Sequence, residues 1–160
     1  MAAPLLIIWH SRTSASEQLA RAAADAAGEK ARLMWCEDVQ PADLQGAQGY
    51  LFVCPENLAA LSGAMKEMFD RCYYPVLGTI EGRAYATIIA AGTDGTNALR
   101  QLDRIATGWR LKQVADPLVA VLHADSKEAI EASKTVPDHF LRQASELAEG
   151  LAEGLALGVF

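Results

Sequence analysis

Short apolar runs alternate along the chain with segments in which apolar residues recur at helical spacing. An apolar run without polar alternation is typical of a strand that is covered on both faces. The runs predict five strands, at residues 5–9, 31–36, 49–54, 85–91 and 118–122. Pro55 is expected to stop the third strand, because proline cannot donate to a strand ladder.

The segments between the strands carry helix signals. Ser14 and Glu17 fit a capping box at the start of the first helix, and Gly28 lies where a carboxyl-terminal cap is expected. Later helices are predicted at residues 62–73, around residues 99–106 with Gly108 as the stop, and after Pro137. The last helix is expected to fray at its end, because it carries Gly150, Gly154 and Gly158.

The order of these elements predicts the fold class. Strands that alternate with helices imply right-handed crossovers, a parallel sheet and helices on both of its faces. Residues 1–160 are therefore expected to form a single α/β domain with a doubly wound, five-stranded sheet. In such sheets a ligand binds beyond the carboxyl ends of the strands, where the winding direction reverses. The loops after the first, third and fourth strands are accordingly the predicted site.

Composition argues against several classes of function. The net charge is -6 and no cluster of Lys and Arg occurs, so a nucleic-acid partner is not expected. The segment Met1–Trp9 lacks a basic region and its apolar run is too short for a signal peptide or a membrane span. We therefore expect a cytoplasmic protein with no membrane partner. No two of the three cysteines, Cys36, Cys54 and Cys72, are spaced as a CxxC motif, so neither disulfides nor a zinc site are predicted.

The first loop, at residues 10–16, is rich in hydroxyl groups. Ser11, Thr13, Ser14 and Ser16 lie between a strand end and a helix start, and the small Ala15 leaves room for close approach. Hydroxyls together with free helix amides form a favourable site for a phosphate group. The alternative is that these residues only cap the helix. His10, at the start of the loop, either donates to the anion or packs against the protein.

The second loop, at residues 55–63, suits a flat heteroaromatic ring. Leu58 and Leu61 can cover a ring face while Glu56, Asn57 and backbone amides meet its polar edge, unless the loop is an ordinary one whose leucines belong to the core. The third loop contains Gly92, Thr93, Asp94 and Gly95, whose glycines permit close backbone approach. The Asp94 side chain is expected to cap the next helix. The chain contains neither GxxxxGK[ST] nor GxGxxG. This argues against a P-loop nucleoside triphosphatase and against a dinucleotide site of the glycine-rich type after the first strand.

Several segments together resemble the flavodoxin and NADPH-dependent FMN reductase superfamily. They are residues 55–57, 62–71, 73–75, 91–95 and 108–110. The resemblance implies a flavodoxin-like, three-layer fold with strand order 2-1-3-4-5, and FMN as the cofactor. It also implies the site residues by position. Ser11, Thr13, Ala15 and Ser16 would bind the FMN phosphate, Pro55, Glu56, Asn57 and Leu58 would line the isoalloxazine, and Gly92, Thr93, Asp94 and Gly95 would lie on its other side.

The third loop also bears on the kind of flavoprotein. No aromatic residue lies between Ala91 and Asn97, so one ring face is expected to stay open for a nicotinamide or a quinone. This favours an NAD(P)H-dependent oxidoreductase that passes hydride or electrons to a small-molecule acceptor, with no catalytic side chain. The alternatives are an electron-transfer protein with a redox partner protein, and a cofactor-free interaction scaffold. The resemblance further implies a homodimer.

Overall fold

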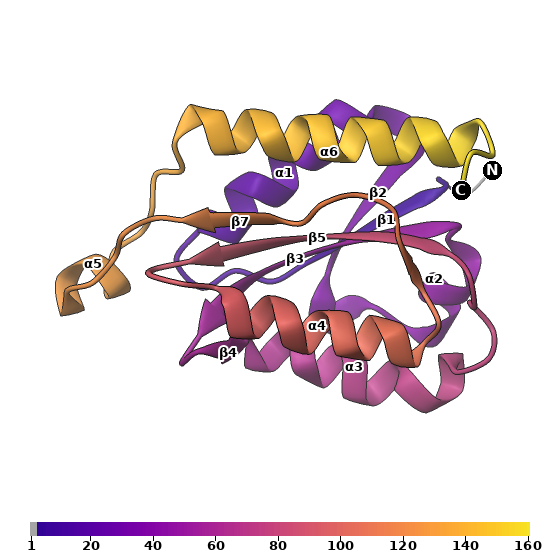
Figure 1. Cartoon of the computed structure of the whole chain (residues 1–160), viewed down its shortest axis with the longest axis horizontal. Coiled ribbons are helices and arrows are strands. Elements are labelled where there is room, and N and C mark those ends of the chain that lie inside the picture. Colours follow the sequence, from indigo (N-terminus) through magenta and orange to yellow (C-terminus); the bar gives the residue numbers. More distant parts are fainter. Residues whose placement is uncertain (1–2) are drawn as a thin grey trace.

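The structure is a computed structural model that describes residues 3–160, so Met1 and Ala2 of the amino-terminal segment discussed above lie outside the described residues. Its centre is a parallel sheet in the order β2-β1-β3-β5-β7, as Figure 1 shows. These strands are β1 (Leu5–Trp9), β2 (Ala31–Trp35), β3 (Gly49–Asn57), β5 (Ala84–Ala91) and β7 (Leu118–Val121). The predicted order is therefore confirmed, with β5 and β7 as the fourth and fifth predicted strands.

Two short strands extend this sheet. β4 (Ala60–Leu61) pairs antiparallel with the end of β3, and β6 (Lys112–Gln113) pairs with the start of β5. The prediction that Pro55 stops the third strand is wrong, because β3 continues to Asn57. Proline removes one donor but its φ is compatible with extended backbone, and the residues after it gain new partners when Glu56 pairs with Leu61.

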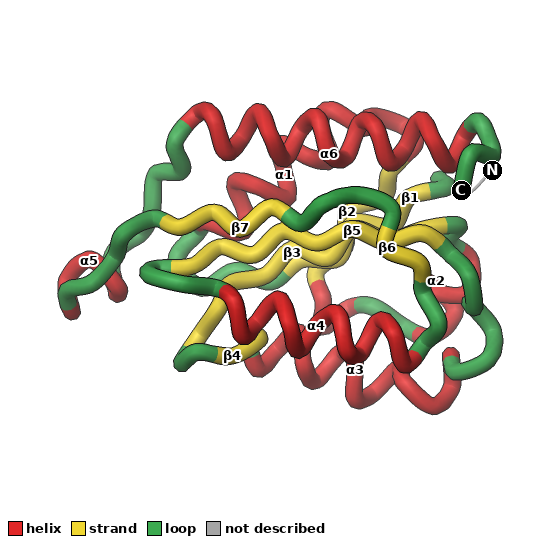
Figure 2. The backbone as a smooth tube through the Cα atoms, in the orientation of Figure 1, coloured by secondary structure: helices red, strands yellow, loops and turns green. Residues whose placement is uncertain are grey.

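Helices cover both faces of the sheet, as the alternation predicts (Figures 1 and 2). One layer contains α1 (Ala15–Ala27) and α6 (Asp138–Ala156), and the other contains α3 (Gly63–Val76) and α4 (Thr96–Gly108). Shorter helices, α2 (Pro41–Gly46) and α5 (Lys127–Glu131), and two 3-10 turns at residues 28–30 and 36–38 lie in connections.

Each layer has its own apolar core, since successive side chains of a strand point to opposite faces. Leu5, Ile7 and Leu51 pack towards the alanine-rich α1 and α6, whereas the cluster on the α3 and α4 side contains larger rings. Trp109 is fully buried there, and its indole N–H donates to the Tyr73 carbonyl at 3.1 Å. Burial on both faces explains why the core strands read as continuous apolar runs.

The first helix begins differently from the prediction. Ser14 has a φ of 67° and its side chain makes no capping bond, so the predicted capping box with Glu17 is wrong. A capping serine needs extended backbone to aim its hydroxyl at the helix amides. The Ser14 hydroxyl instead accepts from Gln18 at 3.1 Å and lies 3.3 Å from the Ser133 hydroxyl. The other end agrees with the prediction, because Gly28 caps α1 with a φ of 57°.

The end of the last helix is ordered, which contradicts the expected fraying. α6 continues through Gly150 and Gly154 to Ala156. A Cβ at Gly154 would collide with the ring of Phe160, because the last residues fold back over the helix and the Val159 amide donates to the Gly154 carbonyl at 2.9 Å. This close packing accounts for one glycine and offsets its low helix propensity.

Candidate functional site

A cavity of about 810 Å3 lies beyond the carboxyl ends of β1, β3 and β5, and we call it the main cavity. It brings together the three loops that the sequence predicts. The predicted site residues that line it are Thr13, Ala15, Pro55, Glu56, Asn57, Leu58, Gly92 and Thr93. Ser11, Ser16, Asp94 and Gly95 are not among its lining residues, and each has a different place in the structure.

The first loop holds hydroxyl groups that the protein itself leaves unpaired. The His10 amide donates to the Val53 carbonyl at 3.0 Å, which ties the start of the loop to β3. The Oγ atoms of Ser11 and Ser16 are buried, yet neither has a hydrogen-bond partner within residues 3–160. A buried hydroxyl without a partner costs about 1–3 kcal/mol, so such groups call for an explanation. An anion at the start of α1 would supply acceptors for both and suit the free helix amides.

Glu56 connects the second loop to the third. Its carboxylate accepts from the Gly95 amide at 2.9 Å and from the Ala98 amide at 3.4 Å, so it caps the start of α4 from a neighbouring strand. A carboxylate is favourable there, because the helix N-terminus carries partial positive charge. The sequence predicts a Glu56 side chain that meets a ring edge, whereas the structure directs its carboxylate to α4. Its role is therefore to hold two walls of the main cavity together.

The turn between β3 and β4 forms the rim of the main cavity. Leu58 and Ala59 both have positive φ, 53° and 59°, in a position where hairpins usually carry glycine or asparagine. The Leu58 side chain is 100% exposed. Contacts with α4 hold the turn in place, since Asn97 donates to the Ala59 carbonyl at 2.6 Å. The interpretation that Leu58 covers a ring face remains a prediction. The same interpretation is wrong for Leu61, which is buried in the core on the α3 and α4 side and does not line the main cavity.

The third loop depends on its glycines. Gly95 has a φ of 87°, and a Cβ there would lie 2.7 Å from Val119. At Gly92 a Cβ would lie 3.0 Å from the Ala124 carbonyl, so any larger residue would push two cavity walls apart. The Asp94 carboxylate accepts from the Thr96 amide at 3.3 Å, in agreement with its predicted capping role.

The segment after β7 contributes to the site, which the sequence does not predict. Residues 122–136 cross over the strand ends to the first loop, where the Lys134 amide donates to the Thr13 carbonyl at 2.8 Å. The Gln18 side chain fixes this crossing, because it donates to the Lys134 carbonyl at 2.7 Å and accepts from the Val136 amide at 3.1 Å. The segment adds Leu122, Ala124, Ile130, Glu131 and Lys134 to the lining of the main cavity.

The main cavity also contains positive charge that the sequence analysis did not assign. Arg12 and Lys134 line it, and neither forms a salt bridge with a carboxylate anywhere in residues 3–160. The Lys134 ammonium instead donates to the carbonyl of Ile130 at 3.0 Å. Arg12 was detectable from its position between the hydroxyls of the first loop, whereas Lys134 lies more than a hundred residues away and had no local signal.

His10 and Cys54 both pack into the protein beside the site. The His10 ring lies 5.1 Å from Trp35 and its Nδ1 is 2.9 Å from the Ser62 hydroxyl. Burial lowers the pKa of the His10 imidazole. Burial also raises the pKa of the fully buried Cys54 thiol to about 12, as expected for a structural cysteine. Across residues 3–160, no group of His, Cys, Asp and Glu side chains is arranged to hold a metal ion.

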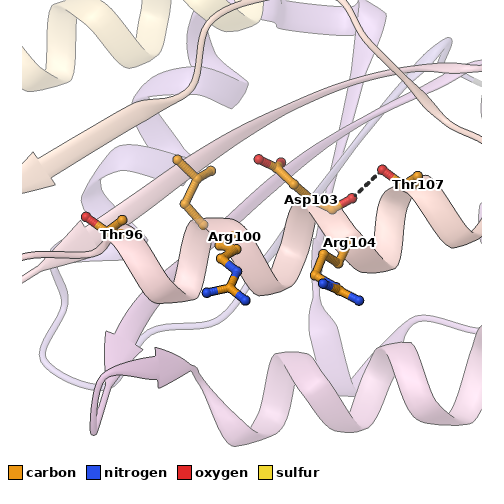
Figure 3. Close-up of a pocket in the computed structure, with 6 residues that line it drawn as sticks. Thr96, Arg100, Asp103, Arg104 and Thr107 are labelled. Atoms are coloured by element: carbon orange, nitrogen blue, oxygen red, sulfur yellow. Dashed lines mark hydrogen bonds between the residues drawn. The ribbon is translucent and has the colours of Figure 1, made fainter.

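A shallow groove of about 520 Å3 follows the outer face of α4 (Figure 3). It shares no lining residue with the main cavity. Arg100 and Arg104 point to one side of the helix and Asp103 to the other. The Asp103 carboxylate accepts from the Tyr85 hydroxyl at 3.1 Å, so this groove is built around a structural contact.

Comparison with solved structures places the fold. A flavodoxin, WrbA-like protein from Agrobacterium tumefaciens has a TM-score of 0.77 at 16% identity, over 96% of this chain and 97% of that chain. A flavodoxin from Streptococcus pneumoniae has a TM-score of 0.72 at 17% identity, over 93% and 97%. A flavodoxin from the domain Archaea has a TM-score of 0.74 at 11% identity, over 95% and 98%. These likenesses define a flavodoxin-like α/β protein and confirm the predicted fold class.

The family follows from the sequence itself. The chain belongs to the NADPH-dependent FMN reductase family, whose profile matches residues 34–126, more than half of the chain. The protein is accordingly an FMN-binding flavoprotein of the oxidoreductase class, as the resemblance implies. No curated protein matches the chain. Within residues 3–160 every helix is too short or too polar to cross a membrane.

Proposed function

We propose that residues 1–160 form a single domain that binds FMN without covalent attachment and uses NAD(P)H to reduce a small acceptor such as a quinone or a flavin. The observation that supports it most is the pair of buried, unpartnered hydroxyls of Ser11 and Ser16 at the start of α1. The cytoplasm is the compartment we propose, since NAD(P)H is the reductant and the three cysteines are free thiols. The homodimer remains a prediction, which light scattering tests.

In this proposal the first loop holds the FMN phosphate. Ser11, Thr13 and Ser16 donate through their hydroxyls, the small Ala15 leaves room for the phosphate, and the amides of the first turn of α1 add partial charge. In a chain with a net charge of -6, these local donors outweigh the unfavourable field of the whole protein.

The second and third loops hold the flavin ring. Pro55, Glu56, Asn57 and Leu58 line one side, and Gly92, Thr93, Asp94 and Gly95 border the other. The glycines of the third loop keep that wall thin, and the hydrogen bonds of Glu56 to α4 hold the two sides at a constant separation. FMN, when bound, supplies the redox chemistry by accepting electrons from the reductant and releasing them to the acceptor.

The protein residues then serve to bind and orient the reactants, and none is required as an acid or a base. The carboxylates near the site bind backbone amides: Glu56 accepts from the Gly95 and Ala98 amides and Asp94 from the Thr96 amide, all at the start of α4. The third loop carries no aromatic side chain, which leaves space over the ring for a second flat molecule.

The test is a pair of titrations. Protein stripped of flavin is titrated with FMN and with riboflavin, which differ only in the phosphate, and flavin fluorescence gives each Kd. We expect much tighter binding of FMN. We also expect the Thr13→Glu variant to narrow this difference, because a carboxylate beside the phosphate repels it. Equal affinity for the two flavins in the wild-type protein would contradict the assignment of the first loop.

A further inference from the structure

A second cavity of about 350 Å3 lies beside the main cavity, towards β2, and we call it the tryptophan cavity. Its volume falls within the range of small-molecule pockets. Arg12, Thr13 and Glu131 line both cavities, so the two share a wall. The remaining lining residues are Trp9, Ser11, Ser14, Glu17, Trp35 and Ser133. A ligand that extends over Arg12 would reach from one cavity into the other.

Two indoles form the apolar wall of the tryptophan cavity. Trp9 ends β1 and Trp35 ends β2, and the strand register places them side by side. Their ring centroids are 4.7 Å apart at an angle of 75°, and both rings are only partly buried. Trp9 packs against the apolar core on the α1 and α6 side, and the Arg21 guanidinium lies 5.6 Å from its ring centroid. Trp35 lies next to Trp9 and the His10 ring, and it belongs to neither core cluster. A partly exposed indole such as Trp35 is suited to stacking with a flat heterocycle such as a nucleic base.

The polar wall is suited to a sugar phosphate. The Arg12 side chain is exposed and forms no salt bridge within residues 3–160, so its five donors are free for an anion. The exposed Glu131 carboxylate is likewise outside these salt bridges, and carboxylates accept from ribose hydroxyls in nucleotide sites. Glu17, in contrast, is engaged by Arg21 at 2.9 Å. Base, sugar and phosphate are therefore each matched by a separate group.

We propose that the tryptophan cavity binds the adenosine phosphate end of the nicotinamide dinucleotide, while the nicotinamide end reaches the main cavity across Arg12. This inference rests on the proposed function, because it assigns the reductant's second half to a site next to the flavin. The base stacks on Trp35, the ribose hydroxyls donate to Glu131, and Arg12 binds phosphate oxygens. The same groups accommodate adenosine 5′-phosphate with or without a 2′-phosphate, and the experiment separates these two ligands.

The test uses the FMN-loaded protein and two fragments of the reductants, 5′-AMP for NADH and 2′,5′-ADP for NADPH. Calorimetry and tryptophan fluorescence measure their binding. We expect at least one fragment to bind, to quench tryptophan fluorescence and to compete with NAD(P)H. Tighter binding of 2′,5′-ADP would identify NADPH as the reductant that the cavity favours, and tighter binding of 5′-AMP would identify NADH.

Variants locate the site. Trp35 lines only the tryptophan cavity, so the Trp35→Leu substitution should raise the Kd of the fragment and the KM for NAD(P)H about 5- to 150-fold, with kcat and the Kd of FMN unchanged. Tyr74→Leu is the matched control, because Tyr74 is 81% exposed and lines neither cavity. Arg12 is exposed, so Arg12→Gln should also weaken fragment binding and provides a second variant if Trp35→Leu does not fold.

The outcomes are distinguishable from failure of the proposed function. If FMN binds and NAD(P)H is oxidised but neither fragment binds, or if Trp35→Leu and Arg12→Gln bind the fragment like the wild type, the tryptophan cavity is not the nucleotide site. A protein that binds no FMN would overturn the proposed function instead, and FMN titration reports this independently of the fragments.

Discussion

The sharpest prediction concerns two buried hydroxyls that look alike but lie in different places. Ser16 at the start of α1 and Thr87 in the middle of β5 are 1% and 2% exposed, and neither Oγ atom has a partner within residues 3–160. Thr87 lies in a strand interior, whereas Ser16 lies in the first turn of α1, directly after Ala15 of the main cavity. The substitution Ser16→Ala removes the hydroxyl, and Thr87→Val replaces the hydroxyl by a methyl group. They form a matched pair that separates a binding role from a purely structural cost.

Both substitutions should stabilise the flavin-free protein. An unsatisfied buried hydroxyl costs about 1–3 kcal/mol, and replacing it by an apolar group of the same shape removes that cost. For Ser16→Ala the higher helix propensity of alanine adds a few tenths of a kcal/mol. We therefore expect the free energy of unfolding to rise by about 1 kcal/mol or more in each variant, measured by urea denaturation of stripped protein.

Only Ser16→Ala should weaken FMN binding. A hydrogen bond to a charged group contributes about 1.5–3 kcal/mol, which corresponds to a loss of about 10- to 150-fold in affinity for FMN. Riboflavin lacks the phosphate, so its affinity should not change. The stabilisation that a fixed excess of FMN confers should fall accordingly, since it varies with the logarithm of the ratio of ligand concentration to Kd. Flavin fluorescence gives both affinities.

The control decides how the result is interpreted. Thr87→Val should leave the Kd of FMN at the wild-type value. If Ser16→Ala also binds FMN like the wild type, the unpartnered Ser16 hydroxyl has no ligand and the phosphate site is misplaced. If Thr87→Val weakens FMN binding equally, the effect arises from general changes in the sheet.

Three further predictions concern the loops and the core. Glu56→Gln should lower both the free energy of unfolding, by about 1 kcal/mol, and the affinity for FMN, because it removes the charge that caps α4; urea denaturation and flavin titration measure these effects. Gly95→Ala should destabilise by more than Gly82→Ala, since both have positive φ but only Gly95 has neighbours that a Cβ would meet; paired thermal unfolding tests this. The free energy of unfolding should fall as the pH rises from 9 to 12. The thiols of Cys36 and Cys54 have a pKa of about 12 in the folded protein and an ordinary pKa of 9.0, so the unfolded chain loses these protons first. Denaturation at several pH values measures this decline.

Each of these has its own contradicting result. Glu81 is exposed, so Glu81→Gln controls for the change in net charge. If Glu56→Gln lowered the free energy of unfolding no more than Glu81→Gln does, the capping role of Glu56 would be excluded. Equal losses of stability in Gly95→Ala and Gly82→Ala would show that the positive φ alone determines the cost of the substitution. A Cys54→Ala variant should have a shallower decline at high pH, and an unchanged slope would assign the decline to other groups.

The core strands were predictable because burial on both faces leaves a direct trace in the sequence. Residues such as Ile7 and Leu51 point into one layer while their neighbours point into the other, so the whole run is apolar. The loops of the site were predictable for a related reason, since the parallel topology brings the ends of β1, β3 and β5 to one edge. The hydroxyl-bearing residues and glycines in these loops then indicated which of them bind a ligand.

The parts that could not be predicted depend on contacts between distant segments. Glu56 finds its partners at Gly95 and Ala98, and Lys134 reaches Thr13 through a connection with no regular pattern. The left-handed Ser14 conformation likewise depends on the crossing segment, because its hydroxyl faces Ser133 instead of the helix amides. Such features follow from tertiary packing, and local spacing carries no information about them.

A crystal structure of the protein grown with FMN tests the central claim most directly. We predict the phosphate at residues 11–16, within hydrogen-bond distance of the Ser16 hydroxyl, and the ring between residues 55–58 and residues 92–95 of the main cavity. A phosphate bound elsewhere, or a first loop that stays empty at saturating FMN, would contradict the account.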